Sequence, residues 1–148
     1  MKIIPLDEGN YSVNKNKEFS VLTESSPATD LKMAIRPFLI ITQHDYLLLD
    51  VGLGEAESHQ QQSPIYRCLE AQGIHPTQIT KIWLSHLHKD HIAGLWRTEG
   101  GQLEANFPQA QIYLQERELE YALQQVDAPN YNIALLEKLN SLPNKVTL

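Results

Sequence analysis

Cysteine is almost absent from this chain, because Cys68 is the only one among 148 residues. One cysteine cannot form a disulfide within the chain, so we expect a protein of a reducing compartment, the cytoplasm. No apolar run is long enough to cross a bilayer, since "QHD" interrupts the most apolar stretch, residues 37–53. The N-terminus also lacks an apolar run followed by a cleavage site, so no signal peptide is expected.

Positive charge is scarce as well. Twelve Lys and Arg residues against 18 Asp and Glu residues give a formal charge of −6, and the pI is about 5.4. This balance argues against non-specific binding to nucleic acid. The length and the 42% hydrophobic content are typical of one globular domain that buries a core. We therefore expect a single cytoplasmic domain, or part of one, that binds neither nucleic acid nor membrane.

Strand patterns dominate the first third of the sequence. Residues 1–6 predict a short strand, and residues 7–30 predict mostly loop, with "EFSVLT" as a candidate strand. The apolar runs "KMAIRPFLIIT" and "YLLLDVG" predict a hairpin that turns at "QHD". Within the first run Pro37 must lie near a bulge or an edge, because proline cannot donate to a sheet.

Helices and strands then alternate. "SPIYRCLEAQGI" predicts a helix with Ser63 as N-cap, Pro64 at the first position and Gly73 just beyond the end, and with Cys68 as a small buried hydrophobe. Residues 79–85 and "AQIYLQ" predict strands, "ERELEYALQQV" and "NYNIALLEKLNSL" predict helices, and "KVTL" predicts a last strand. This alternation indicates a layered α/β or α+β fold.

Three of the six histidines lie within six residues, in "KIWLSHLHKDHIAGLW". Because residues i and i+2 of an extended chain point to one side, His86 and His88 can aim at the same point. Leu87 then points the opposite way, into apolar packing. Asp90 and His91 follow where the chain leaves the strand, and they can turn toward a second point nearby.

Imidazole nitrogen and carboxylate oxygen together suit zinc, manganese or iron, whereas the lack of thiolate argues against a structural zinc knuckle. The segment thus offers His86 and His88 to one metal ion and Asp90 and His91 to a neighbouring one. The alternative is a histidine-rich strand end with an ordinary turn carboxylate. His44, His59 and His75 lie in polar or loop-like surroundings, where surface positions are expected.

These residues carry a family resemblance. "HLHKDH" matches the H-x-H-x-D-H signature of the metallo-β-lactamase fold superfamily, and "LSHLHKDHIAGL" matches its usual context. "YLLLDVG" resembles the family strand that ends in Asp-x-Gly, and "LEAQGIHPTQITKIWLSHLH" resembles the segment that leads into the motif. "NFPQAQIYLQERELEYAL" is similar to the branch of quorum-quenching lactonases and methyl-parathion-hydrolase-like enzymes. The resemblance covers most of residues 38–122.

The resemblance implies the N-terminal half of an αββα sandwich and a metal-dependent hydrolase that uses metal-activated water on an ester, lactone or phosphoester. It implies two Zn²⁺ ions per complete site, with Mn²⁺ or Fe²⁺ as alternatives. His86 and His88 would bind the first ion, and Asp90 and His91 the second. Asp90 would also take part in proton transfer. Asp50 would orient the ligand loop, although a carboxylate that caps a strand-end turn is an equal alternative.

The family completes its site with a histidine, a bridging aspartate and a last histidine from the C-terminal half. After His91 this sequence contains no histidine, and Asp127 is the only aspartate in that part of the chain. We therefore expect residues 1–148 to form a domain that is incomplete at the C-terminus and has a bare apolar sheet face. A longer chain, a natural truncation and the pairing of two copies all remain open, so the expected partner is a second copy or a missing C-terminal half.

Two other classes of function remain open. A truncated half-domain could act without catalysis, by associating with itself or with a partner. A di-iron oxidoreductase is the third class, although no flavin-binding module accompanies the motif. Trp96, just past the motif, could line a substrate pocket, but packing is the commoner role for an aromatic residue there.

Overall fold

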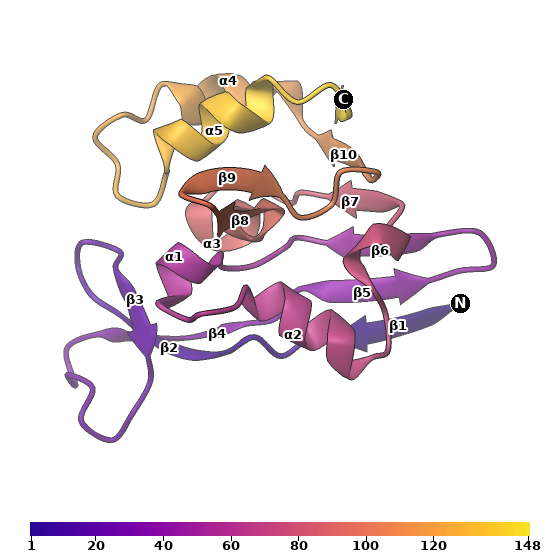
Figure 1. Cartoon of the computed structure of the whole chain (residues 1–148). Coiled ribbons are helices and arrows are strands. Elements are labelled where there is room, and N and C mark those ends of the chain that lie inside the picture. Colours follow the sequence, from indigo (N-terminus) through magenta and orange to yellow (C-terminus); the bar gives the residue numbers. More distant parts are fainter.

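A six-stranded mixed sheet forms the centre of the protein, as seen in the computed structural model, which describes residues 1–148 (Figure 1). Its strand order is β1-β5-β6-β7-β10-β11, with β1, β5 and β6 antiparallel and the last four strands parallel. The strands are β1 (Lys2–Pro5), β5 (Phe38–Ile41), β6 (Tyr46–Leu49), β7 (Lys81–Trp83), β10 (Gln111–Leu114) and β11 (Lys145–Thr147). The hairpin expected at "QHD" joins β5 to β6 and is confirmed.

The parallel pairs require crossover segments, and helices supply them. Helix α2 (Pro64–Ala71) connects β6 to β7, and α4 (Glu116–Leu123) and α5 (Ile133–Asn140) connect β10 to β11. Two one-turn helices, α1 (Glu55–Ser58) and α3 (Lys89–Ile92), and two 3₁₀ turns, η1 (Pro76–Gln78) and η2 (Ala93–Leu95), complete the helical content. None of these helices has the length and apolar character that a membrane span requires.

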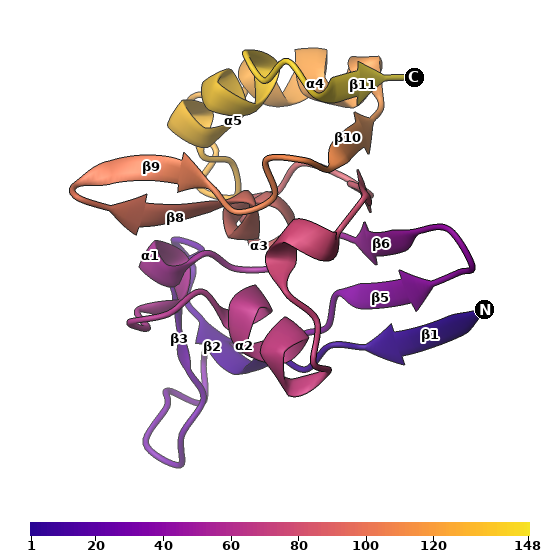
Figure 2. The same ribbon diagram turned by 45° about the vertical axis from the view of Figure 1, so that its right-hand side comes forward.

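Two small sheets flank the central one (Figure 2). One has the order β3-β2-β4, from β2 (Gly9–Val13), β3 (Phe19–Val21) and β4 (Leu31–Ile35), and the other is the hairpin β8 (Trp96–Glu99) and β9 (Gln102–Ala105). The prediction of loop over residues 7–30 was therefore wrong for β2. Tyr11 and Val13 alternate into a small core with Phe19, Ile35 and Leu53, and this burial overrides the Gly-Asn-Ser composition.

The run "KMAIRPFLIIT" is two strands in different sheets rather than one strand. The chain leaves the small sheet after β4 and enters the large sheet at β5, and the break falls at Arg36 and Pro37, where a proline cannot continue the ladder. The strand expected at residues 79–85 is also shorter, since β7 spans only Lys81–Trp83. The helix predicted over "ERELEYALQQV" also ends earlier, since α4 stops at Leu123, and Val126, the last residue of that segment, is 68% exposed.

Helix α2 follows its sequence signals closely. It begins after Ser63 with Pro64 in its first turn, and Gly73 has a φ of +70° just past its end. Its buried side chains, Ile65, Cys68 and Leu69, join the main core. Burial raises the pKa of the Cys68 thiol to about 11, which agrees with a packing role rather than a reactive one.

One face of the large sheet is fully covered. Leu39, Leu48, Ile82 and Ile112 are paired neighbours on β5, β6, β7 and β10, and each is at most 2% exposed. They share one cluster with apolar side chains of α2, α4 and α5. Each such side chain contributes about 1.5–3 kcal/mol through its removal from water.

The opposite face is apolar but uncovered. Phe38, Leu49, Trp83 and Tyr113 are register neighbours across four strands, and Phe38 and Trp83 are 40% and 49% exposed. The rings of Trp83 and Tyr113 lie 5.9 Å apart between centroids. A monomer rarely exposes a contiguous apolar face of this kind. The bare apolar face expected from the sequence is present.

Candidate metal centre

The segment that follows β7 carries the histidine cluster. Leu87 is fully buried, and its backbone N–H donates to Oε1 of Glu118 on α4 at 3.0 Å. With Leu87 directed into the core, the rings of His86 and His88 lie on the other side, 4.5 Å apart between centroids. The alternation predicted from the sequence therefore places these two rings together.

Helix α3 starts directly after His88 and adds the other two predicted ligands. The ring of His91 lies 3.9 Å from that of His86 between centroids, and Nε2 of His91 lies 3.4 Å from Oδ2 of Asp90. Asp90 is buried, whereas the three histidines are partly exposed. The structure thus brings all four predicted ligands into one cluster.

Asp50 joins the segment that carries His86 and His88 to helix α3, which carries His91. Its Oδ1 accepts from the backbone N–H of Ser85 at 2.7 Å, and its Oδ2 accepts from Oγ of Ser85 at 2.7 Å and from Nδ1 of His91 at 2.8 Å. Asp50 has a φ of +56°, a conformation that aspartate tolerates better than most residues. This geometry agrees with the predicted orienting role, although it equally makes Asp50 a structural link at the strand end.

The charges of the cluster follow from these contacts. Burial alone would lower the pKa of His91, but the hydrogen bond to Asp50 and the nearby carboxylate of Asp90 outweigh it and raise this pKa to about 9. For Asp50 burial acts to raise the pKa, but hydrogen bonds from His91 and Ser85 more than offset it; for Asp90 the nearby His91 has the same effect, so both pKa values are lowered. Burial lowers the pKa of His86 and of His88, so both are neutral at pH 7.

Glycines allow the Asp50 turn to pack directly against α3 and η2. The N–H of Val51 donates to the carbonyl of His91 at 3.0 Å, and that of Gly94 donates to the carbonyl of Gly52 at 3.1 Å. A Cβ atom on Gly94 would overlap the carbonyl oxygen of Val51, and one on Gly54 would lie 2.7 Å from the carbonyl oxygen of Ala93. These positions need glycine because two backbone segments meet there.

Lys89, inside the motif, fixes α3 to the neighbouring elements. Its Nζ lies 3.2 Å from Oε2 of Glu57 on α1 and 5.9 Å from the ring centroid of Phe19 on β3. The side chains of Lys89 and Glu57 are only 11% and 20% exposed. A largely desolvated ion pair therefore connects the motif to the small sheet and α1.

The loop between α4 and α5 closes the other side of the cluster. The carbonyl of Asn130 accepts from the N–H of Lys89 at 2.9 Å, and its side-chain nitrogen lies 3.4 Å from Nε2 of His88. The ring of Tyr131 stands edge-on to that of His88, 4.8 Å away between centroids. Sequence reasoning missed these two residues, as well as Ser85 and Glu118. All four act across long sequence separations that no local pattern reveals.

The residues that the sequence placed outside the site stay outside it. His44, His59, His75 and Asp127 are exposed, and none forms a hydrogen bond or an ion pair with the cluster. Trp96 is 2% exposed within the main core, which is the packing role, and its Nε1 has no partner.

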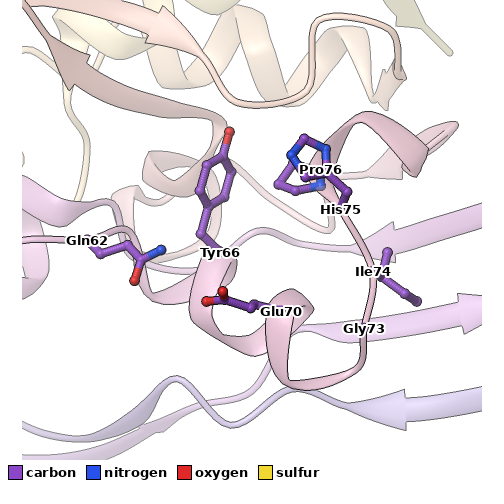
Figure 3. A pocket seen from close by; sticks show the side chains of 7 residues that line it. All are labelled: Gln62, Tyr66, Glu70, Gly73, Ile74, His75 and Pro76. Carbon is purple, nitrogen blue, oxygen red and sulfur yellow. The ribbon is translucent and has the colours of Figure 1, made fainter.

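Of two cavities in the structure, one adjoins the cluster and the other does not. One of about 370 Å³ lies at the C-terminal end of α2 and includes Tyr66, Glu70 and His75 in its lining, but no residue of the cluster (Figure 3). Another of about 290 Å³ is lined by Asp50, Asp90 and His91 together with residues of β4 such as Met33 and Ile35. The second cavity therefore gives access to the cluster.

The donor set suits zinc in part. Three imidazoles and one carboxylate are the ligand types that zinc binds, and neutral His86 and His88 offer free lone pairs. However, no three His, Cys, Asp or Glu side chains converge closely enough to hold an ion in their present positions. A protonated His91 would have to lose the proton on Nε2 before that nitrogen could bind a metal, whereas its Nδ1–H would stay donated to Asp50.

Comparison with known proteins agrees with the family resemblance. Residues 35–97 match the family model of the metallo-beta-lactamase superfamily. The fold resembles AidC, a dizinc quorum-quenching lactonase, in complex with a product N-hexanoyl-L-homoserine, with a TM-score of 0.73 and 22% identity. It also resembles a quorum-quenching N-acyl homoserine lactone lactonase (TM-score 0.69, 21% identity) and a probable metal-dependent hydrolase from Staphylococcus aureus (TM-score 0.66, 20% identity). No curated protein matches the chain.

These matches cover 99% of this chain but only 57%, 56% and 58% of the three solved chains, respectively. The chain therefore spans a little over half the length of the structures it resembles. The fold expected from the resemblance is confirmed: this is a chain with a metallo-β-lactamase-type fold, and the solved structures that it resembles include lactonases.

We predict that Lys89→Met destabilises the metal-free protein by about 1–3 kcal/mol, because Glu57 loses its partner while it remains largely buried. Urea unfolding in the presence of a chelator measures the change. Glu57→Gln provides the matched second variant, and the double variant should be more stable than the sum of the two single effects predicts. Strictly additive effects would show that the ion pair does not connect α3 to α1.

Proposed function

We propose that this chain provides metal-binding residues of a metal-dependent hydrolase that acts on an ester, lactone or phosphoester. The observation that carries the proposal is the cluster itself. The rings of His86, His88 and His91 and the carboxylate of Asp90 gather beside a turn that Asp50 braces. The metallo-β-lactamase-type fold supports the same conclusion.

In this proposal His86 and His88 hold one zinc ion, and Asp90 and His91 hold a second, with Mn²⁺ or Fe²⁺ as alternatives. When bound, the metal supplies Lewis acidity and makes a water molecule nucleophilic near neutral pH. Asp50 accepts the Nδ1–H of His91 and so leaves Nε2 of that ring for the metal. In this proposal Asp90 also takes part in proton transfer.

A small lactone is the first substrate class in this proposal, and a phosphotriester is the second. The lactonases with a similar fold support the first choice. The cavity lined by Asp50, Asp90 and His91 supports a small molecule, because its volume is about 290 Å³. Met33 and Ile35 give that cavity an apolar wall, against which an acyl chain could pack.

The ligand count leads to a further part of the proposal. Each metal would have two protein ligands from this chain, whereas paired hydrolytic metals about 3.5–4 Å apart also share a bridging group. We propose that the remaining ligands come from a segment that covers the uncovered sheet face of Phe38, Leu49, Trp83 and Tyr113. That segment belongs either to a longer polypeptide or to a second copy of this chain.

The second candidate function is a non-catalytic one. The exposed apolar face that includes Phe38 and Trp83 is the observation that favours a half-domain acting only by association. Metal analysis separates the two candidates. About two equivalents of zinc together with hydrolysis supports the enzyme, and an absence of bound metal supports the association domain.

We predict that the cluster binds divalent metal and that His86→Ala or His88→Ala weakens this binding, because each variant removes one imidazole donor. Elemental analysis and calorimetric titration with zinc measure uptake for the wild type and each variant. His75→Ala is the matched control, since His75 is exposed and lies outside the cluster. Unchanged uptake in both cluster variants would remove these residues from the metal site.

Asp50→Asn should lower zinc affinity or activity by about 10- to 100-fold, because the amide cannot orient His91 as a carboxylate does. The same variant should change the melting temperature of the metal-free protein only slightly, since the amide oxygen can still accept from Ser85. A large drop in melting temperature with intact zinc affinity would instead assign Asp50 to capping of the strand-end turn.

Residues 1–148 alone should hydrolyse lactones and phosphotriesters poorly and should self-associate through the uncovered face. Assays with added zinc or manganese, beside a version extended through any downstream reading frame, test the expected poor hydrolysis.

Sedimentation of Trp83→Lys, with Val126→Lys as control, tests the expected self-association. Trp83 lies on the apolar face, whereas Val126 is exposed elsewhere, so only the first variant should shift the protein toward monomer.

Full turnover by a monomeric chain of residues 1–148 would contradict this prediction. It would mean that residues placed outside the cluster, such as His44, His59 or Asp127, complete the site. A shift toward monomer in both lysine variants would show that the uncovered face is not the surface of association.

A further inference from the structure

Glu8, between β1 and β2, is a buried carboxyl group that the proposed chemistry does not use. Its side chain is only 3% exposed, and Oε1 has no hydrogen-bond partner. Its Oε2 accepts from the backbone N–H of Leu53 at 2.9 Å. A buried acid is costly for a fold, so its place beneath the turn of residues 50–53 calls for a physical reason.

The turn and the carboxyl group fit each other closely. Gly52 has a φ of +65°, and a Cβ atom on it would overlap the carboxyl group of Glu8. The side chain of Glu8 therefore occupies the space that any other residue at position 52 would need. On the far side of the same turn, Val51 and Gly52 are hydrogen-bonded to His91 and Gly94. The turn is held between Glu8 and the ligand helix α3.

Glu8 is itself firmly anchored. Its backbone N–H donates to the carbonyl of Ile35 at 3.2 Å, and its carbonyl accepts from the hydroxyl of Tyr11 at 3.2 Å. The preceding carbonyl, that of Asp7, accepts from Sγ of Cys68 on α2 at 3.2 Å. A rigid support therefore reaches the turn from β4, β2 and α2.

The surroundings of the Glu8 carboxyl group favour its neutral, protonated form. Burial raises the pKa of Glu8 to about 8, against the opposing effects of the Leu53 N–H and of the charge on Arg67. A neutral acid and the amide of glutamine have nearly the same shape, and each offers an oxygen to the Leu53 N–H. Glutamine should therefore replace Glu8 well, whereas alanine should not.

We propose that Glu8 is a positioning residue. Its carboxyl group fixes the turn of residues 50–53 and, through Asp50, the orientation of His91. The consequence for metal binding rests on the proposed function. The consequence for the turn does not, because Glu8 contacts Gly52 and Leu53 whether or not a metal is bound.

The test compares Glu8→Gln, Glu8→Ala and Leu69→Ala in the full chain. Leu69 on α2 is fully buried in the main core, so its truncation provides a loss of stability that is unrelated to the turn. Amide hydrogen exchange of Val51 and Leu53 in metal-free protein is the first readout. Zinc affinity by competition with a chromophoric chelator is the second, and the melting temperature is the third.

Glu8→Ala should speed exchange at Val51 and Leu53 and weaken zinc binding, each by about tenfold or more. Glu8→Gln should restore both to within about threefold of wild type, since it keeps the acceptor for Leu53. Leu69→Ala should lower the melting temperature at least as much as Glu8→Ala but leave zinc affinity unchanged. Should Glu8→Ala fail to fold, Glu8→Leu fills the same space without an acceptor and takes its place.

Two outcomes would overturn the proposal. In the first, exchange at Val51 and Leu53 is the same in Glu8→Ala as in wild type. In the second, Leu69→Ala weakens zinc binding as much as Glu8→Ala does, which would make the effect one of general stability. If the wild type binds no zinc at all, the proposed function fails, and the exchange measurement still decides the role of Glu8.

Discussion

The carboxylate of Asp50 is the interaction on which the arrangement of the cluster depends. Its two oxygens accept from Ser85, on the segment that carries His86 and His88, and from His91 on α3. The backbone of the same turn supports this link, because the N–H of Asp50 donates to the carbonyl of Trp83 and that of Val51 to the carbonyl of His91. The positive φ of Asp50 costs about 1–2 kcal/mol, which the three hydrogen bonds and the packing of the turn offset.

Local rules explain which parts of this site could be predicted from the sequence. The two-residue spacing of His86 and His88 and the buried Leu87 between them depend only on extended backbone, and α2 depends on its own end signals. Strand β2 was missed because its burial comes from pairing with β4, about 20 residues away. The contacts of Ser85 and His91 with Asp50 span 35 and 41 residues, so no local pattern reveals them.

His91 and the two carboxylates beside it, Asp50 and Asp90, form the polar centre of the cluster. His91 carries a proton that Asp50 holds at Nδ1, while Asp90 lies near Nε2. A metal ion held by Nε2 of His91 would take the place of a proton on that nitrogen, because both need the same lone pair. The backbone of α3 and of the turn after it is held by the contacts of Lys89, Val51 and Gly94, independently of these side chains.

In the proposed function, the same segment would cover the exposed sheet face and supply the remaining metal ligands. Large aromatic side chains such as Phe38, Trp83 and Tyr113 bury about 150–250 Å² each when covered, so any segment that packs on them gains substantial free energy. If that segment also carries metal ligands, its docking and the completion of the metal site are linked equilibria. Metal then strengthens docking by the same factor by which docking strengthens metal binding. A sheet with one filled face and one open apolar face is suited to this coupling, because the filled face holds the cluster in place before the second face is covered.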